Sequence, residues 1–270
     1  MTESMLPKIS IVTPSFNQSQ FIEETMLSVL NQDYPNYEYI VVDGGSTDGS
    51  VDIIKKYSDR LAYWISEKDR GFGDAINKGF AKATGEILYW LNSDDLLLPG
   101  ALLIVGKYFQ KHRDTGLVFG DRHIIDPNSK LLSKRAYFFY FPGQLKFGKA
   151  LPQECTFWRR DVFLRAGVLD EKLKFAIDFD LWCRMSKTAV IRHIPFYLGA
   201  FREQPASKSS TITTTGFDER DKILLKYFGS KPSALQARVF HFVLGNARRI
   251  FRLTGIVALK RRIISNRIHR

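Results

Sequence analysis

The segment Glu86-Ile87-Leu88-Tyr89-Trp90-Leu91-Asn92-Ser93-Asp94-Asp95 joins an apolar run directly to two adjacent carboxylates. The run over 86–91 predicts a buried strand, so the acids stand at its carboxyl end, where open α/β sheets bind ligands. Adjacent carboxylates repel each other and are costly to desolvate, which favours a cation or a sugar hydroxyl beside them. A divalent metal that holds a diphosphate fits this arrangement. The alternative is a solvated turn that caps the next helix at Pro99.

The residues before this segment alternate between strand and helix patterns. Runs at 8–13, 37–43, 61–66 and 86–91 predict strands. Helical spacing over 20–30, a capping signal at 46–48 that leads into a helix through Tyr57, and a glycine-interrupted stretch over 73–82 predict the helices between them. Repeated βα units of this length imply α/β architecture, a parallel sheet with helices on both faces. We therefore expect residues 8–121 to form a nucleotide-binding α/β layer.

Four motifs stand in a fixed order along this layer: ISIVTPSFN at 9–17, VVDGGSTDGS at 41–50, DRGFGDAINKG at 69–79 and NSDD at 92–95. A fifth, IDFDLW, follows at 177–182. Their order and spacing resemble the inverting glycosyltransferases of family 2, which have the GT-A fold, and five segments together are far more specific than one. The resemblance covers residues 7–205. It implies transfer of a sugar from a nucleotide-diphosphate-sugar to a hydroxyl acceptor.

The acidic pair is the predicted metal site. Oxygen ligands favour Mg²⁺ or Mn²⁺ over zinc. The two cysteines, Cys155 and Cys183, are far apart in sequence and have no zinc-ligand spacing. The resemblance implies that Asp95 ligates the ion, and that Asp94, beside it in the metal site, holds the ribose or the sugar. The ion would bridge the two phosphates and stabilise the charge on the leaving diphosphate.

Further residues are predicted to bind the donor. Thr13, Pro14 and Ser15 end the first strand, where a turn and a hydroxyl can meet a nucleobase edge, although an ordinary strand-ending turn explains them too. The resemblance implies that Asp43 accepts a hydrogen bond from the base and that the 69–79 stretch closes over the nucleotide. For Asp74 the alternative is an acid that complements a helix dipole. The predicted donor-binding residues are Thr13, Pro14, Ser15, Asp43, Asp69, Arg70, Asp74, Ser93 and Asp94.

The reaction also needs a base that takes the proton of the acceptor hydroxyl. Asp178, in the motif that resembles the family's acidic acceptor-side segment, is the candidate. On a helix Asp178 and Asp180 would point about 200° apart, so only one of them can face the site. For Asp180, grouped with the acceptor side, helix capping is the preferred interpretation. The family usually has Glu where Ile177 stands, and Glu154 could supply an acidic contact to the acceptor instead.

Length and composition predict a globular enzyme with one large core, or one core plus an appendage, because 44% of the 270 residues are hydrophobic. We expect a glycosyltransferase domain over 1–205, with a donor half at about 8–121 and an acceptor half at about 122–205, followed by a linker and helix over 206–234. The first seven residues lack an apolar signal core, and two isolated cysteines fit a reducing cytoplasm. The aromatic patch over 137–141 could stack on sugar rings or contact lipid, while burial in the core is the more ordinary explanation.

The C-terminal segment differs in composition from the rest. Residues 235–270 hold nine Lys or Arg and no acid, within a chain of formal net charge +12. Apolar residues interleave with these charges, and no uninterrupted apolar run approaches the ~20 residues that a membrane span requires. A basic amphipathic helical tail that lies on an anionic membrane, at the inner face of the cell membrane, is therefore expected. Packing or self-association is the alternative. Nucleic acid is not expected, because aliphatic residues outnumber base-reading types.

Two other functions remain open on this sequence. A nucleotidyltransferase of similar fold would not need Asp178, and a catalytically silent sugar-nucleotide-binding or scaffold protein would need no base. A dinucleotide-binding dehydrogenase is disfavoured, because its glycine fingerprint would follow the first strand, where this chain has Thr13-Pro14-Ser15-Phe16-Asn17. The preferred prediction is an inverting, metal-dependent glycosyltransferase. Such enzymes commonly build bacterial surface polysaccharides on glycan or lipid-linked acceptors.

Overall fold

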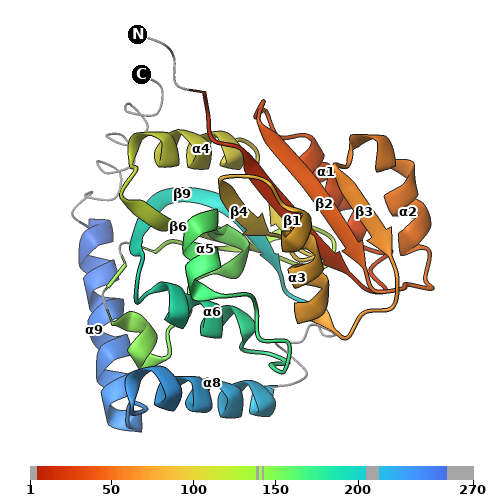
Figure 1. Cartoon of the computed structure of the whole chain (residues 1–270). Helices are drawn as coiled ribbons and strands as arrows, with labels where there is room; N and C mark the ends of the chain where they lie inside the picture. The colour runs from red at the N-terminus through yellow and green to blue at the C-terminus, as the bar shows by residue number, and fades with distance from the viewer. Residues whose placement is uncertain (1–4, 138–139, 142, 205–212, 254–270) are drawn as a thin grey trace.

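A single mixed sheet runs through the computed structural model of the chain between two layers of helices (Figure 1). The structure describes residues 5–137, 140–141, 143–204 and 213–253. The strand order is β3-β2-β1-β4-β8-β6-β9-β5, and β7 pairs with β6. The strands are β1 (Ile9–Ser15), β2 (Tyr37–Asp43), β3 (Tyr63–Ser66), β4 (Ile87–Trp90), β5 (Leu96–Leu97), β6 (Thr115–Ile125), β7 (Leu131–Arg135), β8 (Thr156–Arg159) and β9 (Val190–Arg202).

Helices cover both faces of the sheet. The helices are α1 (Ile22–Leu30), α2 (Ser50–Lys56), α3 (Phe72–Lys82), α4 (Ala101–Lys111), α5 (Arg160–Ala166), α6 (Ile177–Met185), α8 (Thr213–Phe228) and α9 (Ala234–Leu253), with short 3₁₀ turns η1 (Ser58–Arg60), η2 (Gln144–Phe147) and η3 (Gln153–Cys155). Buried residues of α3, α5 and α6 share one core cluster with one face of the strands. Those of α1, α2 and α4 share a second cluster with the other face. Successive strand residues such as Ile11 and Val12 point into opposite clusters.

The predicted α/β architecture is confirmed, and the pairing divides the sheet into two parts. Strands β3, β2, β1 and β4 are parallel neighbours, as repeated βα units require. Beyond β4 the pairing is mixed, because β8 runs antiparallel to both β4 and β6 while β9 runs parallel to β6. The first half of the sheet, β1 to β4, therefore places the carboxyl ends of four strands at one edge. The second half adds β9, which brings Arg202 back to that edge.

The helix predicted to start from the 46–48 capping signal begins later, at Ser50. Gly49 turns the chain at φ 98°, a left-handed conformation that favours glycine. Gly49 is the N-cap residue, and the Asp48 carboxylate, one residue earlier, accepts a hydrogen bond from the Ser50 backbone N–H at 3.0 Å. The same carboxylate accepts the Ser19 N–H at 2.8 Å. Asp48 thus joins the start of α2 to the loop after β1.

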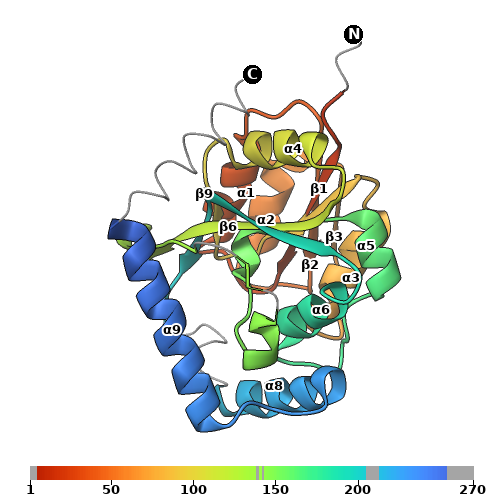
Figure 2. The same ribbon diagram turned by 90° about the vertical axis from the view of Figure 1, so that its left-hand side faces the viewer.

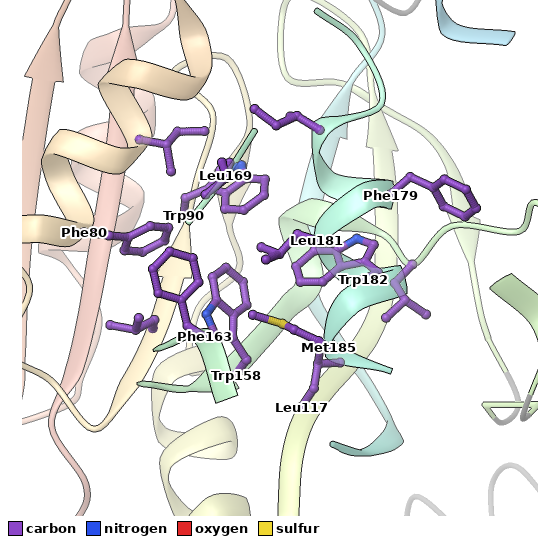
Figure 3. Close-up of a cluster of buried hydrophobic side chains, with 14 of the residues drawn as sticks. Phe80, Trp90, Leu117, Trp158, Phe163, Leu169, Phe179, Leu181, Trp182 and Met185 are labelled. Carbon is purple, nitrogen blue, oxygen red and sulfur yellow. The ribbon is translucent and has the colours of Figure 1, made fainter. Parts of the chain in front are cut away.

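An aromatic cluster makes the end of β4 rigid (Figure 3). Trp90, the last residue of β4, stacks on Trp182 of α6 with ring centroids 5.9 Å apart and an interplanar angle of 7°. Trp158 packs edge-on against both rings, at 5.6 and 5.2 Å. Aromatic pairs in these geometries stabilise beyond the area they bury. The residues that follow Trp90 therefore leave the core from a fixed position, and α6 is fixed to the same point.

The last two described helices lie along the outside of the molecule (Figure 2). Helix α8 packs on α6, and its Glu219 carboxylate accepts the backbone N–H groups of Lys174, Phe175 and Ala176 at 2.8 to 2.9 Å. These N–H groups precede α6, so Glu219 holds the start of that helix. Helix α9 contacts η2, where Phe240 stacks on Phe147 at 4.2 Å. Residues 254–270 of the predicted tail lie outside the described residues. Within the part of the chain that is described, no helix is both long and apolar enough to cross a membrane.

Candidate active site

A cavity of about 1340 Å³ opens at the carboxyl ends of β1 to β4 and extends toward the second half of the sheet. Each predicted ligand-binding loop sends at least one residue into its wall. The predicted site residues that line it are Pro14, Ser15, Asp69, Ser93, Asp94, Asp95, Glu154 and Asp178. Residues predicted from separate motifs therefore meet at one place. Thr13, Asp43, Arg70, Asp74 and Asp180 are not part of this wall.

The acidic pair is held in place by its backbone and by one arginine. The Thr25 hydroxyl lies 2.9 and 2.8 Å from the carbonyl oxygens of Ser93 and Asp95. The buried Asp95 carboxylate accepts the Arg202 backbone N–H at 2.9 Å. Gln204 donates its side-chain amide to the Asp94 carboxylate at 2.7 Å. The turn predicted from the sequence is thus fixed from α1 and from the end of β9.

Arg202 is a site residue that no sequence motif indicates. Its guanidinium is fully buried, and its Nε donates to the Asp94 carbonyl at 2.7 Å. Its other nitrogens bind the carbonyls of Asp126 and Pro127 and the Glu24 carboxylate, the last at 2.7 Å. One side chain therefore ties the acidic turn to α1 and to the turn after β6. No local pattern reveals this, because its partners are spread over 178 residues of sequence.

The end of the cavity beside β2 and β3 is shaped by a close approach between two loops. Asp69, after β3, lies so near Gly44, after β2, that a Cβ atom on Gly44 would stand 2.4 Å from the Asp69 carboxylate. A side chain at position 44 would therefore have to displace the Asp69 carboxylate from this position. The Asp69 carboxylate also accepts the Gly71 N–H at 2.8 Å. Asp69 and Ser15 face the cavity from neighbouring loops.

Four of the predicted donor residues, Thr13, Asp43, Arg70 and Asp74, hold the loops from behind instead of facing the cavity. The fully buried Asp43 carboxylate accepts hydrogen bonds from Ser46 and Ser66 side chains and from the Gly45 and Ser46 N–H groups. Thr13 accepts the Tyr39 hydroxyl at 2.9 Å. The Asp74 carboxylate accepts the Arg70 backbone and guanidinium at 3.0 and 2.7 Å.

The ionisation of Asp74 matches that structural position. Although burial raises its pKa, hydrogen bonds from Arg70 and Lys78 outweigh burial and lower it to about 2. Arg70 also pairs with Glu171 at 2.9 Å. Asp74 and Arg70 therefore form an ion-pair network that fixes the loop carrying Asp69.

The two acids of the IDFDLW motif point in different directions. Asp178 lines the cavity, while Asp180 turns away and pairs with Arg184 at 2.8 Å and with the Tyr227 hydroxyl at 2.9 Å. Burial raises the pKa of Asp178 to about 6, and the charge of Glu154 adds to this, although the Phe179 N–H at 2.7 Å opposes it. A carboxylate with this pKa is ionised at pH 7 and is a competent proton acceptor. The placement of Asp180 agrees with its expected structural role.

A model of the family described as "Glycosyl transferase family 2" matches residues 10–187. This chain belongs to glycosyltransferase family 2. An uncharacterised glycosyltransferase of Rickettsia typhi is 30% identical over an alignment of 200 positions that covers 68% of this chain and 60% of the relative. The chain therefore spans about 60% of the length of the first curated relatives it matches. A PGL/p-HBAD biosynthesis glycosyltransferase of Mycobacterium bovis is 27% identical over 79% of this chain and 84% of its own length.

Solved structures show that this family 2 glycosyltransferase has the GT-A fold. TarS of S. aureus in complex with UDP-GlcNAc superposes with a TM-score of 0.63 at 18% identity, over 82% of this chain and 71% of that chain. The mannosyltransferase PcManGT of Pyrobaculum calidifontis, in complex with GDP-Man and Mn²⁺, gives 0.62 at 18% identity, over 97% and 74%. The predicted family and fold are both confirmed.

The carboxylates of the glycosyltransferase cavity can hold a divalent cation only together with oxygen atoms of the substrate. Within the described ranges, no group of three or more His, Cys, Asp or Glu residues is arranged to hold a metal. Mg²⁺ and similar ions are commonly bound by one or two carboxylates together with substrate phosphates and water. Burial, with the charges of Asp94 and Glu154, raises the pKa of Asp95 well above its usual value. A cation beside Asp95 would relieve this unfavourable burial of charge, so the residues present fit such an ion.

Six lining residues of the glycosyltransferase each hold a buried polar atom without a hydrogen-bond partner in the described part of the chain. These atoms are Ser15 Oγ, Gln18 Oε1, Trp90 Nε1, Asn92 Oδ1, Arg122 Nε and Gln153 Oε1. Buried polar atoms are seldom left unpaired, so these are the groups that a ligand would be expected to engage. Sequence analysis missed Gln18, Arg122 and Gln153, because a single polar residue outside the motifs carries no distinctive spacing, and it assigned no role to Asn92 although Asn92 begins the NSDD motif.

Proposed function

We propose that this protein is an inverting glycosyltransferase that moves a sugar from a nucleotide-diphosphate-sugar to a hydroxyl acceptor with one Mn²⁺ or Mg²⁺ ion. The observation that supports this most is the position of Asp178. It faces the same cavity as Asp94 and Asp95 and its pKa lies near 6. The neighbours that hold UDP-GlcNAc and GDP-Man in their own structures support the donor class.

In the proposed reaction, the donor lies across the carboxyl ends of β1 to β4. Asp95 and Asp94 would hold the cation, which supplies charge stabilisation for the departing diphosphate. Asp69 and Ser15 would bind the nucleoside end. Asp178 would take the proton of the acceptor hydroxyl. At the same time the hydroxyl oxygen would attack the anomeric carbon of the donor from the face opposite the leaving group. Asp43, Arg70, Asp74 and Thr13 would hold the donor loops in position.

The products of turnover test this proposal. The full chain, incubated with a panel of nucleotide sugars and sugar acceptors with and without Mn²⁺, is expected to release nucleoside diphosphate and a glycoside of inverted anomeric configuration. Mass spectrometry and NMR of the glycoside check both. Release of pyrophosphate would indicate a nucleotidyltransferase. Donor binding without any release would indicate a catalytically silent binding protein.

The first prediction is an acidic limb in the pH profile. Because the ionised form of Asp178 is the base, activity should fall as pH drops through about 6, approaching tenfold per pH unit below it. The profile of kcat/KM for the acceptor measures this at saturating donor and metal. The residual activity of Asp178→Asn should lack the limb. A limb that persists in this variant would assign the titration to another group.

The second prediction concerns Arg202, which we expect to position the acidic turn. Arg202→Met should weaken Mn²⁺ and donor binding roughly tenfold or more and lower the free energy of unfolding by about 2–4 kcal/mol, because it leaves carbonyl acceptors and Glu24 without their partner. Arg202→Lys should not restore binding, since one ammonium cannot replace the planar fork. Arg165→Met, at an exposed pair with Asp161, is the matched control. If Arg202→Met binds the donor with unchanged affinity, Arg202 does not position the acidic turn.

The third prediction concerns the acceptor and α9. We propose a glycan or lipid-linked acceptor at an anionic membrane surface, in bacterial surface polysaccharide synthesis at the inner face of the cell membrane. Leu235, Val239 and Phe242 form an exposed stripe on α9 within the acid-free segment, while Phe240 packs inward on Phe147. Replacing the three stripe residues by Ser should abolish sedimentation with anionic vesicles without lowering thermal stability. Salt should weaken the binding of the unmodified protein.

The control for this prediction is Phe240→Ser, which should lower thermal stability instead. Deletion of residues 235–270 should release the protein from vesicles, reduce transfer to a lipid-linked acceptor, and largely preserve transfer to a small soluble acceptor. If the deletion unfolds the protein or separates a dimer while vesicle binding is unchanged, the tail is a packing element.

A further inference from the structure

We propose that the acceptor is an uncharged, hydroxyl-bearing sugar, and that the cavity rejects acceptors that carry a phosphate or carboxylate near the reacting hydroxyl. The inference rests on the proposed function, because it concerns the second substrate of the same site. It follows from the charge of the cavity wall and from the chemistry of the side chains around Asp178.

The wall of the cavity carries more negative than positive charge. Its acidic residues are Asp69, Asp94, Asp95, Glu154, Asp178 and Glu203, and its basic residues are Lys68 and Arg122. A donor diphosphate with one divalent cation is close to neutral, so binding the donor does not reverse this excess. An acceptor that enters afterwards still meets a negative field.

The excess extends to the acceptor half. Among the described residues here, the wall holds the acids Glu154, Asp178 and Glu203 and one cation, Arg122, whose charge is already paired with Glu154. Arg122 lies 3.3 Å from the Glu154 carboxylate and sits over the Phe201 ring at 5.3 Å. Glu154 is close enough to raise the pKa of both Asp95 and Asp178. Arg220 of α8 is a second cation near Asp178, whose pKa its charge acts to lower, and its guanidinium donates to the Gly148 carbonyl at 2.8 Å. An anion placed here would therefore approach several carboxylates while both of these cations are engaged with other groups.

The remaining wall suits a neutral sugar. Tyr137, Phe175 and Phe201 supply aromatic surface for the apolar face of a ring. Arg122 Nε offers a buried donor and Gln153 Oε1 a buried acceptor, each without a partner in the described residues. Hydroxyl groups, which both donate and accept, can satisfy these two atoms together. A carboxylate or a fully ionised phosphate can accept from Arg122 but cannot donate to Gln153.

Like-charge contacts across a binding site are a common basis of selectivity, and they typically cost enough to reduce use of the wrong ligand by ~10²-fold. The test uses matched acceptors that differ only in charge: an aryl glucoside against the aryl glucuronide, and an aryl N-acetylglucosaminide against its 6-phosphate. With the donor found active in the panel, kcat/KM for the neutral member should exceed that for the anionic member by ~10²-fold. Raising ionic strength should narrow this ratio through screening.

The variant Glu203→Gln makes the test specific to the cavity. Removing this carboxylate should raise use of the anionic acceptors several-fold while the neutral ones change little. Asp161→Asn, which removes an equal charge on the exposed face of α5, should leave the ratio unchanged. Equal or preferential use of the anionic members, with diphosphate release observed, would overturn this inference alone. Absence of diphosphate release with every donor would overturn the proposed function and this inference with it.

Discussion

Asp178→Asn is expected to lower kcat by ~10²–10⁴-fold, the usual contribution of a general base, while donor affinity stays near that of the unmodified protein. The side chain faces the cavity and is isosteric with the amide, so the substitution removes the base without changing the wall. Transfer rates under saturating donor and acceptor, together with calorimetric donor affinity, measure the two effects separately.

The same substitution should stabilise the protein at pH 7. The folded pKa of Asp178, about 6, lies above its ordinary value of 3.8. A raised pKa means that its contribution to stability is fully present below about 3.8 and is lost as pH rises through about 6. At pH 7 the ionised carboxylate therefore opposes folding, by about 1–2 kcal/mol after allowance for its partial exposure. Asn carries no charge, so the unfolding temperature should rise as activity falls.

Asp180→Asn is the matched control, with the opposite effect expected on stability and little effect on the rate. It disturbs the buried pair with Arg184 and the contact with Tyr227, which should lower the free energy of unfolding by about 1–3 kcal/mol. The rate should stay near that of the unmodified enzyme. If the two variants exchange behaviour, Asp180 is the base. If both retain full activity, the acceptor proton goes to another group and the role of Asp178 is wrong.

The second large effect is expected from Asp95→Asn. This variant should lose transfer by at least ~10²-fold and should bind Mn²⁺ and donor more weakly, because the proposed cation forms part of the donor site. The Asn carbonyl can still accept the Arg202 N–H, so the turn keeps its anchor. Since burial already disfavours the charged form of Asp95, thermal stability without metal should not fall.

Removal of the metal by a chelator tests the same prediction independently. Excess EDTA should abolish transfer by the unmodified protein, and Mn²⁺ or Mg²⁺ should restore it. Asp161→Asn, which removes an exposed carboxylate from α5, should behave like the unmodified protein throughout. Full activity in excess chelator, or normal donor affinity in Asp95→Asn, would exclude the metal role of this residue.

Local sequence was sufficient for the first half of the fold. Each βα unit carries its own apolar period and turn signals, and parallel strands place their carboxyl ends at one edge whatever the rest of the chain does. For that reason the motifs alone assign Ser15, Asp69 and Asp95 to one site, and all three line the cavity. The mixed pairing of β8 and β9 could not be predicted so directly, because antiparallel and parallel neighbours look alike in a short buried strand.

The sequence by itself determined which motifs meet, and the tertiary structure decided which way each side chain acts. Asp43 and Asp178 both belong to acidic motifs, yet one carboxylate is enclosed by four hydrogen bonds and the other lines the cavity. Arg202 acquires its role only because β9 returns to the acidic turn, and Glu219 only because α8 packs on α6. The physical reason is that a carboxylate or guanidinium takes its role from the partners and solvent around it. Long-range packing, which no local spacing encodes, supplies both.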